Sequence, residues 1–205
     1  MAIIVIGGQS RNVGKTSVVC GLISAMPERR WTAIKITQCK HDAPYGEPCD
    51  CELAGQSMAV SEERDLATGT DSSRYLAAGA VRSFWIRVRA GCLGEAMPRI
   101  RAEIESAVNV ILESNSVLEY LTPDLYAAVL DTAVTDFKPS ARRNLDQADA
   151  ILICAGPTRQ PALLGVPANL MPRSRVFGIE PPSYSSAEFL SFVVRTLDGR
   201  KRGGV

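Results

Sequence analysis

Short apolar runs alternate with longer amphipathic segments along most of the chain. The apolar runs are rich in Ile, Leu and Val and are bounded by polar or turn-forming residues, a pattern that predicts buried strands. The longer segments repeat their apolar residues at helical spacing. The predicted strands are residues 2–6, 32–37, 83–88, 109–112, 125–130, 150–153 and 175–179. The predicted helices are residues 18–26, 72–80, 93–107, 139–148 and 185–197.

This alternation predicts an α/β fold: a doubly wound, mostly parallel sheet between two layers of helices. The chain has 205 residues, of which 46% are hydrophobic, so it can bury a sizeable core. We expect one domain over residues 1–197 and a flexible tail at 198–205. The basic run Arg200–Arg202 lies in this tail and is expected to be solvated.

Residues 38–70 interrupt the alternation. A segment of this length without predicted structure is uncommon in a compact domain and is often functional. It follows the strand predicted at 32–37, at the carboxyl-terminal edge of the sheet where doubly wound folds bind ligands. We therefore expect residues 38–70 to form a functional loop beside the active site.

The strongest local signal is a Gly-bearing turn between the first predicted strand and the first predicted helix. It reads Gly-Gln-Ser-Arg-Asn-Val-Gly-Lys-Thr-Ser. A strand, a turn ending in Gly-Lys-Thr and a helix predict a phosphate-binding loop, where backbone N–H groups and the helix dipole attract phosphates. Lys15 is expected to reach the outer phosphates in a catalytic role, and Thr16 to ligate Mg²⁺. The residues expected to bind nucleotide are Gly8, Ser10, Arg11, Asn12, Val13, Gly14, Lys15, Thr16 and Ser17.

Composition narrows the class of partner. The net charge of +1 gives no electrostatic case for binding nucleic acid or an acidic membrane. No apolar run approaches the roughly 20 residues that span a bilayer. The first run has no charged region ahead of it and leads directly into the phosphate loop, so we do not expect a signal peptide. We expect a cytoplasmic protein whose six cysteines are reduced.

Glu113 follows the apolar strand predicted at 109–112. A carboxylate in this position can hold Mg²⁺, directly or through water, beside the hydroxyl of Thr16. An acid at the end of a strand can also serve solubility alone. Because the chain carries a phosphate loop, we favour the metal-binding role and expect Glu113 to act in catalysis.

Cysteine and histidine gather in the long loop, at Cys39, His41, Cys49 and Cys51. Such a set can bind Zn²⁺ tetrahedrally, and a thiolate cluster can also be redox-active. The alternative is that the cysteines are small loop side chains and that His41, the only histidine, contacts a phosphate. The neighbouring Lys40 is a second candidate contact to substrate. The Cys-x-Cys spacing is tighter than that of the usual zinc knuckle, and both interpretations stay open.

These segments together resemble the molybdopterin-guanine dinucleotide biosynthesis protein B (MobB) family. The resemblance spans roughly the first 115 residues. It implies a GTP-binding P-loop NTPase, generally dimeric, that assists in attaching a guanine nucleotide to the molybdenum cofactor. The matching segments, in order, are the phosphate loop, the strand leading into Lys40-His41, the string from Thr70 to Ala80 with its Asp-Ser-x-Arg start and Ala-Gly-Ala end, and the strand ending in Glu113.

The Asp-Ser-x-Arg string also has a physical interpretation. Asp71 or Ser72 can cap a helix whose N-terminus faces the phosphate edge, and Arg74 can meet a second anion there. We therefore take these three residues as candidate contacts to a small phosphorylated ligand. An ordinary capped helix is the alternative.

Two other functions remain open. Gly8 to Thr16 match the Gly-x-x-x-x-Val-Gly-Lys-Thr loop of dethiobiotin synthetase, a resemblance that implies an ATP-dependent ligase or small-molecule kinase. The cysteine cluster suggests a nucleotide-gated metallochaperone. No Asn-Lys-x-Asp segment selects guanine, so GTP and ATP, each with Mg²⁺, both fit. The leading interpretation is a MobB-like nucleoside-triphosphate hydrolase that forms a homodimer.

Overall fold

The computed structural model describes residues 1–39, 56–154, 175–184 and 186–202. The helices are α1 (Lys15–Ala25), α2 (Asp71–Ala77), α3 (Leu93–Glu105), α4 (Pro139–Asn144) and α5 (Ala187–Arg202). The strands are β1 (Ile3–Gly8), β2 (Trp31–Cys39), β3 (Met58–Glu63), β4 (Arg82–Arg89), β5 (Asn109–Glu113), β6 (Leu125–Asp131), β7 (Ala150–Cys154) and β8 (Arg175–Ile179). Single 3₁₀ turns lie at η1 (Pro27–Arg29), η2 (Ser116–Glu119) and η3 (Leu145–Gln147).

The strands form one sheet in the order β3-β4-β2-β5-β1-β6-β7-β8. Every neighbouring pair is parallel except β3 and β4. The expected α/β fold with a doubly wound, mostly parallel sheet is therefore confirmed. The register pairs Ile6 of β1 with Glu113 of β5, so the phosphate loop and Glu113 leave the sheet side by side at its carboxyl-terminal edge.

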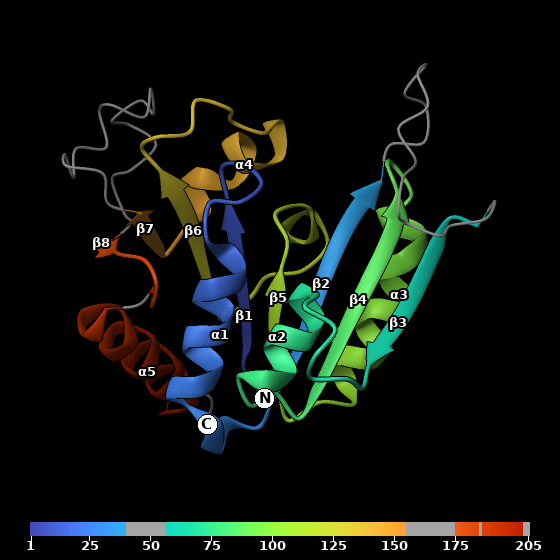
Figure 1. Ribbon diagram of the computed structural model, residues 1–205, viewed down its shortest axis with the longest axis horizontal. Coiled ribbons are helices and arrows are strands. Elements are labelled where there is room, and N and C mark those ends of the chain that lie inside the picture. Colours follow the sequence, from blue (N-terminus) through green and yellow to red (C-terminus); the bar gives the residue numbers. More distant parts are fainter. Residues whose placement is uncertain (40–55, 155–174, 185, 203–205) are drawn as a thin grey trace.

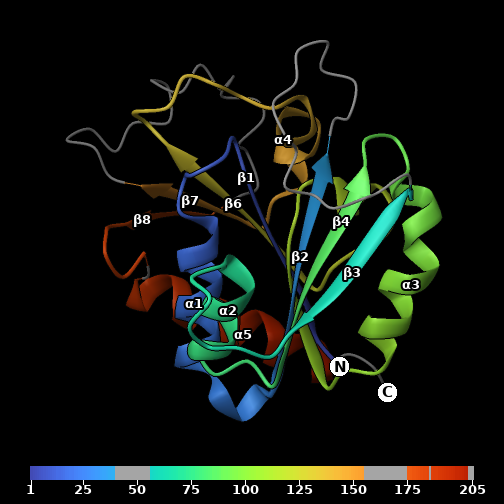
Figure 2. The same ribbon diagram turned by 45° about the vertical axis from the view of Figure 1, so that its right-hand side comes forward.

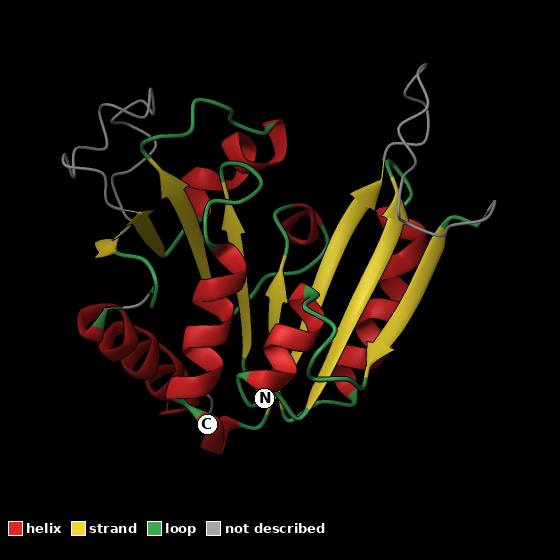
Figure 3. Ribbon diagram, viewed as in Figure 1, coloured by secondary structure: helices red, strands yellow, loops and turns green. Residues whose placement is uncertain are grey.

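Helices cover both faces of the sheet, as Figures 1 and 3 show. Alternate residues of each strand point to opposite faces, so Ile4 and Ile6 pack with α1 and α5, whereas Val5 packs on the side of α3. The two buried clusters contain mostly Ile, Val, Leu and Ala, and burial of this apolar surface is the main stabilising contribution. The core thus forms a rigid platform for the loops at one edge.

The predicted elements correspond to observed ones, with boundaries moved by a few residues. One expectation is wrong: the long loop contains the strand β3 at Met58–Glu63. Met58 and Val60 pack in the core on the α3 side, whereas Ser61 and Glu63 face the other way. Only one face of this edge strand is apolar, so its hydrophobic signal is weak. Residues 40–55 of the expected loop lie outside the described residues.

Candidate functional site

The phosphate loop connects β1 to α1 through two residues with positive φ, Asn12 (59°) and Gly14 (93°). Gly14 is also the N-cap of α1, the residue that directly precedes the helix. A Cβ atom there would lie 2.4 Å from the Tyr184 ring, and one on Gly8 would lie 2.8 Å from the Val129 carbonyl oxygen. Both positions therefore require glycine, because the loop backbone is packed closely on its neighbours.

Gln9 anchors the loop to the segment that follows β6. Its Nε2 donates to the carbonyl oxygen of Val134 at 2.6 Å, and its Oε1 accepts from the backbone N–H of Asp131 at 2.8 Å. Ser10 adds a hydroxyl bond to Asp136 at 2.6 Å. Gln9 is 1% exposed. The common phosphate-loop pattern Gly-x-x-x-x-Gly-Lys-Thr would place a glycine at position 9. Gln9 instead has a structural role here, because both the N–H and the C=O of its side-chain amide form hydrogen bonds.

Lys15 folds back over the loop. Its Nζ donates to the carbonyl oxygen of Ser10 at 2.6 Å. Burial lowers the pKa of Lys15 to about 8, with the positive charges of Lys138 and Lys35 acting in the same direction and Glu113 opposing them. An anion placed on this loop would relieve the cost of holding the ammonium group, so the site favours phosphate oxygens.

Glu113 is the acceptor at the centre of the site. The Thr16 hydroxyl donates to its Oε2 at 2.7 Å, the Tyr75 hydroxyl donates to the same oxygen, and Lys35 Nζ lies 3.4 Å from its Oε1. Glu113 is 6% exposed, so its charge is compensated by these partners rather than by water. The hydroxyl of Thr16 and the carboxylate of Glu113 form an oxygen donor set of the kind that Mg²⁺ prefers.

The start of α2 reaches the same site. Asp71 forms an ion pair with Lys35, and Arg74 donates to the Ser17 hydroxyl at 3.0 Å and lies 3.5 Å from Asp71. Burial raises the pKa of Asp71, but the hydrogen bond and charge of Lys35 outweigh that effect and hold it below its usual value. Asp71 is therefore a carboxylate that orients Lys35 beside the phosphate loop.

One detail of the expected capping is wrong. Thr70, the residue before Asp71, is the N-cap of α2, and its hydroxyl accepts from the backbone N–H of Ser73 at 3.1 Å. Ser72 is 4% exposed and donates its hydroxyl to Glu63 at 3.1 Å. Because Asp71 is paired with Lys35 and Ser72 with β3, neither side chain is available to cap the helix.

Sequence interpretation missed Lys35 and Tyr75. Lys35 carried a signal, since it is a charged residue inside the apolar segment Ile34-Lys35-Ile36. Nothing in the sequence indicated a role for Tyr75, because its contact with Glu113 depends on the packing of α2 against the sheet. Burial, followed by the negative charge of Glu113, raises the pKa of Tyr75 well above its usual value, so Tyr75 keeps its proton and donates a hydrogen bond to the carboxylate.

We expect Tyr75→Phe to weaken the response to Mg²⁺ more than the affinity for nucleotide. The change removes one donor from Glu113 and leaves the ring packed, so the carboxylate loses orientation while the phosphate loop is unaffected. The concentration of Mg²⁺ that gives half-maximal turnover should rise by about tenfold. Titrating Mg²⁺ at saturating nucleotide checks this, and an unchanged midpoint would assign Tyr75 to packing alone.

The expected cysteine and histidine cluster is described only in part. Cys39 ends β2, is 7% exposed and packs against Ala59. Lys40, His41, Cys49 and Cys51 lie outside the described residues. Among residues 1–39, 56–154, 175–184 and 186–202, no three His, Cys, Asp or Glu side chains are grouped as metal ligands. The zinc site stays a prediction.

Metal content tests this prediction directly. If Cys39, His41, Cys49 and Cys51 enclose one ion, purified protein should carry close to one zinc per chain, and His41→Ala should lower that content. If His41 instead contacts a phosphate of the substrate, the same variant should change KM or kcat with metal content unchanged. A metal-free preparation with reactive thiols at Cys39, Cys49 and Cys51 would contradict the site.

No known protein-family profile matches the chain, and no curated protein matches it. Two solved structures resemble it in fold. HypB from Archaeoglobus fulgidus, a hydrogenase maturation factor, is 11% identical with a TM-score of 0.50, over 96% of this chain and 90% of that one. HypB from Helicobacter pylori, solved in complex with nickel, is 13% identical with a TM-score of 0.48, over 96% and 87%.

The chain shares the fold of the Archaeoglobus HypB structure, and in this chain it is a mostly parallel sheet with helices on both faces. The loop after β1 carries the Gly-Lys-Thr sequence of a phosphate-binding loop. The MobB and dethiobiotin synthetase resemblances are not confirmed by these comparisons. In the part of the chain that the structure describes, no helix is both long and apolar enough to cross a membrane.

Proposed function

We propose that the chain is a Mg²⁺-dependent nucleoside triphosphatase. The observation that carries this proposal is the 2.7 Å hydrogen bond between Thr16, in the phosphate loop, and the buried carboxylate of Glu113. Two oxygen ligands for one cation, one from the start of α1 and one from the end of β5, lie directly beside a lysine that faces an anion site. This arrangement supports phosphoryl chemistry more than it supports a purely structural turn.

Each side chain has a physical role in this proposal. The loop N–H groups and the Lys15 ammonium would bind the outer phosphates, and Thr16 with Glu113 would hold Mg²⁺. A cation held by Thr16 and Glu113 would supply positive charge that stabilises the negative charge of the outer phosphates. Lys35, held by Asp71, supplies a second positive charge at the same edge. These charges are fixed before nucleotide enters, which lowers the reorganisation needed in the transition state.

The finer proposal is a MobB-like GTP-binding accessory in molybdenum cofactor biosynthesis, active as a homodimer. Its support is that the segment containing the Asp-Ser-x-Arg string meets the candidate site: Arg74 contacts Ser17 of the phosphate loop, and Tyr75 contacts Glu113 at the end of β5. Guanine preference within this proposal comes from the resemblance alone.

A second candidate is an ATP-dependent ligase or small-molecule kinase. It is favoured by the cavity beside Lys35, because an enzyme of this type must hold a small acceptor next to the outer phosphate. The third candidate, a nucleotide-gated metallochaperone, depends on the cysteine cluster and on the zinc measurement given above.

Nucleotide specificity and product formation distinguish these functions. Thermal midpoints are measured with GTP and with ATP, each with and without Mg²⁺, followed by phosphate release without any acceptor. The proposal predicts a Mg²⁺-dependent rise in midpoint with at least one nucleotide. Slow hydrolysis with a preference for GTP supports the accessory role, whereas ATP consumption only when an acceptor is present supports the ligase or kinase. No response to either nucleotide would contradict the proposed function.

A further inference from the structure

A cavity lies beside the candidate nucleotide site. Among the described elements, α1, α2 and α5 leave the carboxyl-terminal parts of β2 and β4 uncovered on their side of the sheet, as the two orientations in Figures 1 and 2 show. A cavity of about 280 Å³ opens there, between the start of α2 and this bare part of the sheet. It is lined by Lys35, Gly69, Thr70, Asp71, Ser72 and Trp85.

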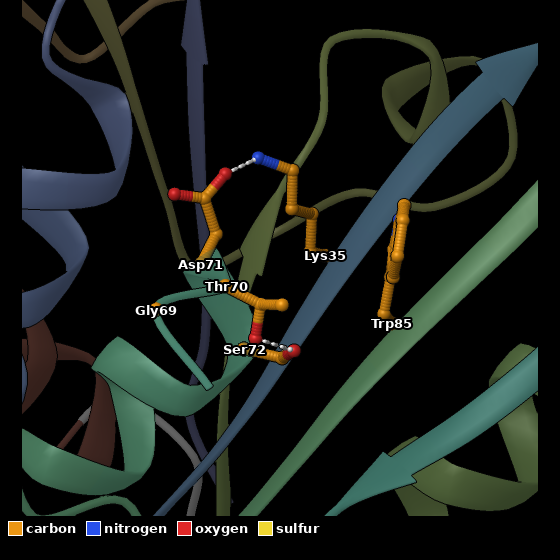
Figure 4. Close-up of a pocket in the computed structure, with 6 residues that line it drawn as sticks. All are labelled: Lys35, Gly69, Thr70, Asp71, Ser72 and Trp85. Carbon is orange, nitrogen blue, oxygen red and sulfur yellow. Dashed lines mark hydrogen bonds and ion pairs between the residues drawn. The ribbon is translucent and has the colours of Figure 1, made fainter. Parts of the chain in front are cut away.

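Trp85 forms a flat wall of the cavity. Figure 4 shows its ring edge-on, standing across from Lys35 and Asp71. The indole Nε1 donates to the Thr37 hydroxyl at 3.0 Å, and the Arg87 guanidinium lies 4.5 Å from the ring centroid. These two contacts hold the ring in one orientation, so it offers a preformed surface to a planar ligand.

Lys35 provides positive charge in the same cavity. An ammonium group has three donors, and Asp71 and Glu113 accept from two of them. Among the described residues, the third has no acceptor. Asp71 is shared between Lys35 and Arg74, so its negative charge is compensated twice. An acidic group on a ligand can therefore approach Lys35 without facing an uncompensated carboxylate at Asp71.

The hydroxyl groups of the cavity are already committed. Thr70 and Ser72 each donate to Glu63, at 3.0 and 3.1 Å. The cavity thus offers one cation and one aromatic face, rather than a set of hydroxyl groups suited to a sugar. This combination selects a ligand with a flat ring and an anionic substituent.

We propose that this cavity binds a small planar anion, an aromatic or heteroaromatic carboxylate or phosphate, with its ring against Trp85 and its acidic group on Lys35. Because Lys35 also lies 3.4 Å from Glu113, the acidic group sits next to the expected position of the outer phosphates. Its role as a reaction partner of the nucleotide rests on the proposed function, whereas binding in the cavity does not.

The test uses four probes with one carbon skeleton: naphthoate, naphthyl phosphate, naphthamide and decahydronaphthoate. The protein contains two tryptophans, so its ¹⁵N-labelled form gives two indole N–H signals in NMR spectra. We expect naphthoate and naphthyl phosphate to shift the Trp85 signal and to leave that of Trp31, which is 1% exposed, in place. Naphthamide should bind about tenfold more weakly, because it lacks the charge. Decahydronaphthoate should also bind more weakly, because it lacks the flat ring.

Variants locate the binding. Lys35→Met and Trp85→Leu should each weaken naphthoate binding by about tenfold, measured by calorimetry because the second variant lacks the Trp85 signal. Arg101→Met is the matched control, since it removes one positive charge from α3 on the opposite face of the sheet, and it should leave the affinity unchanged. Equal affinity for naphthoate and naphthamide, or a Trp85 signal that no probe moves in the wild-type protein, would overturn the proposal. The stronger of the two anionic probes identifies the preferred acidic group.

The triphosphatase activity and the cavity site can be refuted independently of each other. Lys15→Ala should lose nucleotide and retain naphthoate, because Lys15 does not line the cavity. A protein that ignores all nucleotides while naphthoate shifts the Trp85 signal would refute the triphosphatase and leave the cavity site standing. A protein that hydrolyses nucleotide but binds neither anionic probe would refute the cavity site alone.

Discussion

Lys15→Ala is expected to reduce nucleotide turnover by about a hundredfold or more, because it removes a preorganised positive charge from the position of the outer phosphates. Affinity for the triphosphate should fall by about tenfold to a hundredfold, the usual effect of losing a charge-assisted hydrogen bond. Affinity for the nucleoside without phosphates should not change. Turnover by phosphate release, and binding by calorimetry with each nucleotide, measure these effects.

The fold should survive this change. Burial lowers the pKa of Lys15 to about 8, so at pH 7 the ammonium is charged in both the folded and the unfolded chain but is held less favourably in the folded one. Removing it should leave the thermal midpoint of the nucleotide-free protein unchanged or higher. Lys15→Arg keeps the charge with a different shape and should restore only part of the binding. Wild-type affinity in the alanine variant would refute the phosphate-loop interpretation.

The sheet was predictable because its strands are buried on both faces. Residues 110–112 and Ala150–Cys154 are apolar throughout, so both their positions and their parallel pairing follow from the sequence. The edge strand at Met58–Glu63 differs, since one of its faces is polar and it lies inside a long irregular segment. Its pairing with β4 depends on contacts distant in sequence, which a local pattern does not contain.

The candidate site also has one part that the sequence predicts and one part that depends on tertiary packing. The phosphate loop is a local motif, so its nucleotide contacts could be inferred from the spacing of Gly14, Lys15 and Thr16. The partners of Glu113 come from β2 and α2 as well as from the loop, and only the tertiary packing brings Lys35 and Tyr75 to it. A lysine within an apolar strand segment, here Lys35, is the one signal from which sequence interpretation could have found this cluster.

Glu113→Gln is expected to separate catalysis from binding. The amide keeps the shape of the carboxylate and removes its charge, so turnover should fall by about a hundredfold or more, while nucleotide affinity changes by less than about tenfold. The reason is that affinity comes mainly from Lys15 and the loop N–H groups, whereas Glu113 acts through Mg²⁺. Turnover and nucleotide affinity measured across a series of Mg²⁺ concentrations test this difference.

Glu113→Gln should also lower the stability of the fold, and a control variant can separate this effect from the effect on turnover. Both oxygens of Glu113 accept hydrogen bonds, so the new amide group must turn a donor toward either Lys35 or the hydroxyls of Thr16 and Tyr75. We expect the free energy of unfolding to fall by about 1–3 kcal/mol. Glu103→Gln makes the same change at another buried carboxylate, 2.6 Å from Arg99 on α3, and should lower stability without affecting turnover. Unchanged turnover of Glu113→Gln at limiting Mg²⁺ would remove Glu113 from the metal site, whereas a loss of turnover shared equally by both variants would trace the effect to stability.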